Sequence, residues 1–216
     1  VLLIEPGKYL GGMTTGGLGM TDIGNKYAVT GLARLFYRRV GEHYGKFEQW
    51  TFPPSVATKS MNRFVEDADL DVMYYRRITK AEVRNKEIKS IILEDSQSPL
   101  GEPLVAIKAK EFIDCSYEGD LMARAGVSYV VGREDNSDYD ETLDGVQLLY
   151  AHQFPDGIDP YVVEGDSTSG LCWGIQKQTL KKDGTGDRLV QAYNFRLCLT
   201  DNKDNQLPFV RPESYD

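Results

Sequence analysis

The strongest constraint on the fold stands at the start of the chain, where an apolar run ends in an acid and a glycine-rich loop follows: VLLIEPGKYLGGMTTGGLGMTD. The four apolar residues before Glu5, bounded by Pro6-Gly7, predict a short and fully buried strand. An acid at the carboxyl end of a parallel strand can accept hydrogen bonds from both hydroxyls of a ribose. Glycines let backbone N–H groups approach a phosphate or a flat ring closely. The residues by themselves leave two interpretations balanced: a nucleotide site, or a surface acid beside an ordinary loop.

The following segments alternate between helical and extended patterns. Apolar spacing predicts helices over 30–45, with Thr30 as the N-cap, and over about 54–68. Strands are predicted at 71–78, 80–85, 88–95 and 106–116, and a short helix at 119–126. Beyond Gly132 the chain becomes rich in Gly, Asp, Tyr and Gln, with one strong strand pattern at 189–200. We therefore expect an α/β domain over 1–132 and a β-rich domain over 133–216.

Composition narrows the function classes. The net charge of −8 over 216 residues disfavours binding to nucleic-acid backbones, and no apolar run is long enough to span a membrane. Cys115, Cys172 and Cys198 lie far apart, so that buried, reduced thiols are expected. Two histidines are too few for a His-based metal cluster, and no metal site is predicted. The compartment, cytoplasmic or bacterial periplasmic, and the oligomeric state are left open.

Several long blocks resemble one family. VLLIEPGKYLGGMTTGGLG is similar to the second strand and flavin loop of FAD-dependent oxidoreductases of the two-dinucleotide-binding-motif type. FIDCSYEGDLMARAGVSYVVGRE, DPYVVEGDSTSGL and QAYNFRLCLT extend the likeness over essentially the whole chain. It is greatest to the bacterial FAD-dependent oxidoreductases, some of which carry the label xanthan lyase. The resemblance implies a Rossmann-like FAD-binding domain with an attached β-rich substrate domain.

The resemblance also implies roles for the opening motif. Glu5 takes the ribose-binding position, and a loop along the pyrophosphate and the flavin is formed by Gly11, Gly12, Met13, Thr14, Thr15 and Gly16. That loop contains no His or Cys, so we expect non-covalent FAD. The first strand and GxGxxG fingerprint of such a fold do not precede Glu5. We therefore expect the chain to be the interior of a longer enzyme and to bind FAD weakly by itself.

A second motif, FIDCSYEGD, resembles the turn that packs near the adenosine-pyrophosphate part of the cofactor in these flavoproteins. Asp114, Cys115 and Ser116 are the candidate contacts, although Tyr117 and Glu118 stand where glycine is commoner. A second interpretation, which can hold together with the first, is a helix cap, in which Ser116 caps the helix at 119–126. The fold type further implies that backbone near the start of a strand pair touches the adenine, and Ile78 is the candidate.

Three residues are candidates for catalysis. His152 can accept a proton from a substrate hydroxyl, and Arg196 can bind a carboxylate or stabilise an alkoxide, with Tyr193 nearby in sequence. A hydrogen-bonded structural His and a paired Arg are the alternatives. The resulting hypothesis is hydride transfer from a small organic, sugar-derived substrate to FAD. Two other hypotheses are a polysaccharide lyase, using Tyr193 or His152 as base with Asn194 or Arg196 on a uronate, and a non-catalytic nucleotide-binding remnant.

Overall fold

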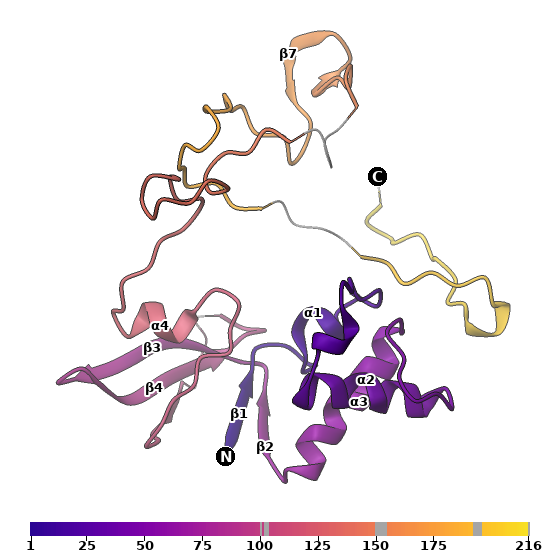
Figure 1. Ribbon diagram of the computed structural model, residues 1–216, viewed down its shortest axis with the longest axis vertical. Helices are drawn as coiled ribbons and strands as arrows, with labels where there is room; N and C mark the ends of the chain where they lie inside the picture. Colours follow the sequence, from indigo (N-terminus) through magenta and orange to yellow (C-terminus); the bar gives the residue numbers. More distant parts are fainter. Residues whose placement is uncertain (100, 102–103, 150–154, 192–195, 216) are drawn as a thin grey trace. The chain divides into compact units, whose positions relative to one another are not determined.

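The computed structural model describes residues 1–99, 101, 104–149, 155–191 and 196–215, and the order of its elements mixes helices and strands as in an α/β protein (Figure 1). In chain order these are β1 (Leu2–Glu5), α1 (Gly12–Thr15), η1 (Lys26–Ala28), α2 (Gly31–His43), α3 (Pro54–Asp67), β2 (Asp71–Tyr74), β3 (Arg76–Arg84), β4 (Glu87–Asp95), β5 (Val105–Ile107), α4 (Asp120–Arg124), β6 (Tyr161–Val163), β7 (Asp166–Leu171) and η2 (Lys203–Asn205).

The chain divides into two units. Val1–Val127 and Asn194–Asp216 form the first, and Ser128–Tyr193 forms the second. The expected functional domains, 1–132 and 133–216, stay a prediction.

The first unit begins with a parallel strand pair. β1 pairs with β2, with Glu5 opposite Tyr74, and the chain crosses between them through α1, α2 and α3 (Figure 1). Parallel strands require such a crossover, which explains why helical segments separate them. The prediction of a fully buried β1 is wrong: Leu2 is exposed and the rest of the strand is half-buried. The physical reason is that β1 hydrogen-bonds to β2 alone among the described strands.

The helices α2 and α3 confirm the predictions for 30–45 and 54–68 to within a few end residues. Pro54 occupies the first position of α3, where its missing N–H costs no hydrogen bond. Phe36 and Val40 from α2 pack with Val56 of α3 in one apolar core, which also contains Phe52 from the connecting segment. This core holds together the crossover that connects β1 with β2.

An antiparallel sheet of β3, β4 and β5 follows. Asn85 and Lys86 have φ angles of 53° and 62° between β3 and β4, as a two-residue type I′ hairpin requires. The strand predicted over 71–78 is instead divided between β2 and β3 by Tyr75, whose φ is 54°. The strand predicted over 106–116 is wrong beyond Ile107. The polar groups of Asp114 and Ser116 bind the start of α4 instead of a neighbouring strand.

The second unit contains a short hairpin of β6 and β7. Among the described residues of this unit, Val146 is the most buried apolar one. The predicted strand at 189–200 is wrong for its described parts, 189–191 and 196–200, which are irregular. Leu197 and Leu199, in the part that belongs to the first unit, are largely exposed and pack against no described strand. The β-rich character of the substrate domain stays a prediction.

Two further predictions concern membrane-spanning segments and the cysteines. Among the residues that the structure describes, no helix has both the length and the apolar character needed to cross a membrane. The expectation of buried thiols is wrong, because Cys115, Cys172 and Cys198 are all free and exposed. All three stand in or beside irregular surface segments.

Candidate functional site

Glu5 lies at the carboxyl end of β1, as its sequence position predicts. Its side chain is folded back over the following turn, where the Gly7 N–H donates a hydrogen bond to Glu5 Oε1 at 2.6 Å. An ionised carboxylate offers about four lone-pair positions. The half-buried Glu5 therefore keeps acceptor capacity for the two donors of a ribose after binding the Gly7 amide.

The turn after Glu5 is attached to the start of the antiparallel sheet. The Tyr75 N–H donates to the Gly7 carbonyl at 3.2 Å, and the Ser96 hydroxyl donates to the Pro6 carbonyl. Ser96 N–H also donates to the Tyr75 carbonyl at 3.1 Å. Ile78 lies in β3, three residues beyond Tyr75 and opposite Leu93 of β4. These bonds bring the acid and the beginning of β3 to the same edge of the first unit.

The glycine loop has a defined conformation. Gly11 and Gly12 have φ angles of 97° and 52°, in the left-handed region that favours glycine. Thr15 is buried, and its hydroxyl donates to the Leu10 carbonyl at 2.6 Å. The resemblance placed Thr14 and Thr15 in the cofactor loop, but the Thr15 hydroxyl is already bonded within the loop segment. Thr14 is half-buried and stays a candidate contact for the cofactor. Gly16 is exposed at the end of α1.

The second motif caps α4. Asp114 Oδ2 accepts the Met122 N–H at 3.0 Å, and Ser116 Oγ accepts the Asp120 N–H at 2.8 Å. Ser116 also donates from its hydroxyl and its backbone N–H to Asp114 Oδ1, at 2.7 and 2.9 Å. The capping interpretation therefore has direct support, with one correction: Gly119, in the left-handed conformation, occupies the N-cap position predicted for Ser116.

These contacts also affect the ionisation of Asp114. Desolvation is the largest single influence and opposes the charged form. The hydrogen bonds from the Ser116 hydroxyl and from the amides of Met122, Ser116 and Leu121 together outweigh it, so that the pKa of Asp114 lies below its ordinary value. The carboxylate is therefore charged at neutral pH and bound to the helix start. Cys115, between the two capping residues, is exposed.

The two motifs meet at Tyr117. The Met13 N–H donates to Tyr117 Oη at 2.7 Å, and a Cβ on Gly12 would lie 2.1 Å from the same oxygen. The position of the Tyr117 phenol therefore depends on glycine at position 12. Sequence reasoning noted Tyr117 only as a departure from glycine and did not include it in the site. The unusual residue type at that position was the available signal.

Of the candidate catalytic residues, the structure describes Arg196. Arg196 is exposed, and a Cβ on Gly17, directly after the glycine loop, would lie 3.3 Å from the Arg196 Cβ. His152 and Tyr193, together with Asn194, lie outside the described residues. The structure thus brings one candidate, Arg196, to the loop.

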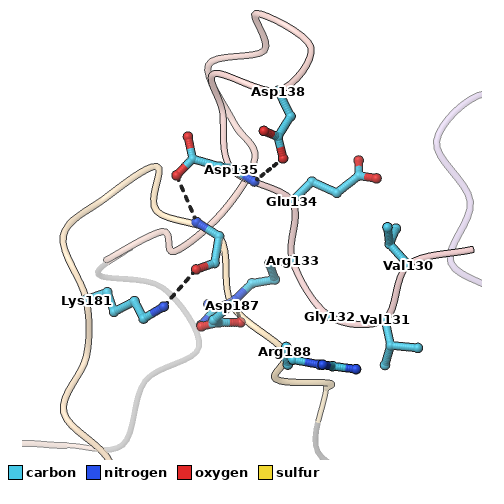
Figure 2. Close-up of a pocket in the computed structure, with 11 residues that line it drawn as sticks. Val130, Val131, Gly132, Arg133, Glu134, Asp135, Asp138, Lys181, Asp187 and Arg188 are labelled. Atoms are coloured by element: carbon cyan, nitrogen blue, oxygen red, sulfur yellow. Dashed lines mark hydrogen bonds and ion pairs between the residues drawn. The ribbon is translucent and has the colours of Figure 1, made fainter.

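The second unit contains an open pocket of about 420 Å³ (Figure 2). Arg133 and Asp187 form a bidentate ion pair in its wall and exchange two backbone hydrogen bonds of 2.9 Å. The hydrogen bond from Arg133 is the main reason that the pKa of Asp187 is lowered. Lys181 donates to the Gly186 carbonyl at 3.0 Å, and the Gly186 N–H donates to Asp135 at 3.2 Å.

The polar groups of this pocket therefore mostly bind one another. They join the segments around 133 and 187, which are far apart in sequence. In Figure 2 the Arg188 side chain extends toward Val131. Arg188 has no hydrogen bond or ion pair within the part of the chain that the structure describes. No sequence prediction fell on this pocket, whose polar walls stabilise the fold of the second unit.

The arrangement of Glu5, the glycine loop and the capped turn defines a candidate nucleotide site on an α/β scaffold. The model of the FAD dependent oxidoreductase family matches residues 1–216, and the chain belongs to this family. The resemblance inferred from the sequence motifs is thereby confirmed. No curated protein matches the chain.

The described residues fit the FAD that this family implies. Glu5 has free acceptor positions, and Gly11 and Gly12 give the loop its left-handed turn, with the Tyr117 phenol beside Gly12. Met13, beside them, is exposed. A dinucleotide requires an acceptor for its ribose hydroxyls, which an acid provides. It also requires donors for its diphosphate, which the N–H groups of a glycine loop provide.

Proposed function

We propose that the protein binds FAD non-covalently and oxidises a small organic, sugar-derived substrate. The observation that carries the proposal is the convergence of two sequence-distant motifs on one loop, through the Tyr117 contact with Met13 beside the strand that ends in Glu5. Family membership as an FAD dependent oxidoreductase supports the same conclusion. Family membership and the convergence of the two motifs thus both support an FAD-binding oxidoreductase.

In this proposal Glu5 accepts hydrogen bonds from the adenosine ribose, and Gly11, Gly12, Met13, Thr14 and Gly16 line the diphosphate and flavin. Backbone groups of Ile78 and of Asp114, Cys115 and Ser116 are the proposed contacts to the adenosine part of the cofactor. Thr15 stabilises the loop, because its hydroxyl donates a hydrogen bond to the Leu10 carbonyl. The absence of His and Cys from the GGMTTGG sequence supports non-covalent binding.

When bound, FAD supplies an acceptor for a hydride from the substrate carbon. His152 takes the proton of the substrate hydroxyl, because an imidazole titrates near neutral pH. Arg196 binds a carboxylate of the substrate or stabilises the developing alkoxide, and Tyr193 helps to position the same group. The position of Arg196 beside Gly17 supports a substrate site next to the glycine loop.

The test is the visible absorption spectrum of the full-length protein, purified after expression with added riboflavin. We expect flavin bands, release of the pigment on acid precipitation, and identification of the released pigment as FAD. Titration of the flavin-free protein with FAD and FMN sharpens the test, since only FAD contains the ribose that Glu5 is proposed to bind. A colourless protein that binds neither flavin in titration would overturn the proposal.

A further inference from the structure

The strongest unexplained contact in the first unit is the one between Tyr117 and the glycine loop. Tyr117 is 68% exposed, yet its phenol oxygen is held at 2.7 Å from the Met13 nitrogen. The approach depends on Gly12, whose Cβ would overlap the phenol. A side chain that is this exposed and still fixed against the glycine loop stands where a ligand of that loop would contact it.

The side-chain hydrogen bonds of the second motif leave the Tyr117 hydroxyl hydrogen without a described acceptor. Asp114 accepts from the first turn of α4, and the Ser116 hydroxyl both donates to Asp114 and accepts from Asp120. Tyr117 uses its oxygen as an acceptor for Met13, and its own O–H has no acceptor among the described residues. A phenol can accept and donate at once, and accepting the amide hydrogen strengthens its remaining O–H as a donor.

We propose that Tyr117 is a cofactor-binding residue that holds the Met13 amide and donates its O–H to a diphosphate oxygen of FAD. This inference rests on the proposed function. The second motif thus contacts the cofactor through the Tyr117 side chain, while the Asp114 and Ser116 side chains stabilise α4.

The test uses Tyr117→Phe in the full-length protein, with ADP and adenosine as competitors of FAD binding. We expect FAD and ADP to bind about tenfold more weakly or worse, the usual effect of losing one hydrogen bond to a charged group. Adenosine has no phosphate, so its affinity should be unchanged. Tyr27→Phe is the matched control, because Tyr27 is 73% exposed and its hydroxyl has no hydrogen bond among the described residues.

A second variant keeps the inference testable. In Gly12→Ala the new methyl group displaces the phenol, so the same selective loss of ADP over adenosine is expected. Equal affinities of wild type and Tyr117→Phe for FAD and ADP would overturn the inference. An equal loss for ADP and adenosine would also overturn it, because a diphosphate contact would not weaken adenosine. A wild-type protein that binds neither FAD nor ADP would instead contradict the proposed function.

Discussion

Replacing Glu5 by alanine is the most direct perturbation of the proposed cofactor site. The side chain stands at the end of β1, is half-buried, and makes one described hydrogen bond, from the Gly7 amide at 2.6 Å. Its remaining acceptor positions are available to the ribose hydroxyls. Glu5→Ala therefore removes the ribose contact together with one local turn bond, and leaves the β1–β2 backbone pairing in place.

The expected size follows from the number of bonds lost. A hydrogen bond to a charged group contributes about 1.5–3 kcal/mol. About 1.4 kcal/mol corresponds to tenfold in affinity, so the loss of one ribose bond already weakens FAD binding by at least about tenfold. The Gly7 amide is near the surface and can bind water instead, so we expect the variant to stay folded.

The assay compares ADP with 2′-deoxy-ADP as competitors of FAD on the full-length protein. The wild type should prefer ADP by about tenfold or more, because the deoxy compound lacks one of the two hydroxyls that Glu5 accepts. Glu5→Ala should bind both compounds equally weakly. This comparison separates a ribose contact from a general effect on the site, since it depends on one hydroxyl group.

Glu213→Ala is the matched control, because Glu213 is an exposed acid of the same unit. Thermal denaturation of both variants monitors folding. The reasoning would be refuted by a Glu5→Ala protein that binds FAD like the wild type, or one that still distinguishes ADP from its deoxy form. Glu5 would then be a surface acid whose function is to close the Gly7 turn.

Two further predictions concern proton transfer and stability. His152→Ala should slow reduction of the flavin by substrate about 10²–10⁴-fold in stopped-flow bleaching and remove an ionisation near neutral pH, with normal FAD content; bleaching at the wild-type rate would make His152 structural. Asp114→Asn should lower the melting temperature near neutral pH. The pKa of Asp114 is depressed below its ordinary 3.8. The charged carboxylate therefore stabilises the folded state above that pH, and this contribution is lost as the pH falls through the folded-state pKa. The melting temperatures of wild type and variant should therefore converge below about pH 4, and a difference independent of pH would contradict the capping role of the charge.

Local patterns predicted the elements whose stabilisation is itself local. The helices α2 and α3 follow from 3.6-residue apolar spacing, and the hairpin at Asn85-Lys86 follows from its turn residues. The strand predicted at 106–116 failed beyond Ile107 because the alternating pattern says nothing about whether a partner strand is present. The apolar Ile113 is 84% exposed in that segment. A strand depends on its neighbour, and a sequence window does not contain the neighbour.

The candidate site shows the same limit. The position of Glu5 at a strand end was predictable, because four apolar residues and a Pro-Gly turn specify it locally. The bond from the Thr15 hydroxyl to Leu10 was not predictable, since the sequence does not distinguish the two adjacent threonines of the loop. Tyr117 was missed for a stronger reason: its contact with Met13 joins positions 104 residues apart.

The same long-range contact changes how the glycine at position 12 is explained. Gly31 has a φ of 59°, and a Cβ at that position would meet nothing within 4 Å, so conformation by itself accounts for glycine there. Gly12 has a similar φ of 52°, but the space that its Cβ would fill is already taken by the Tyr117 phenol. An L-residue could accept the strain of a left-handed φ at a cost of about 1 kcal/mol, but its Cβ would also displace the Tyr117 phenol from the Met13 amide. The glycine of the first motif and the tyrosine of the second therefore constrain each other, and the two motifs form one structural unit around the loop.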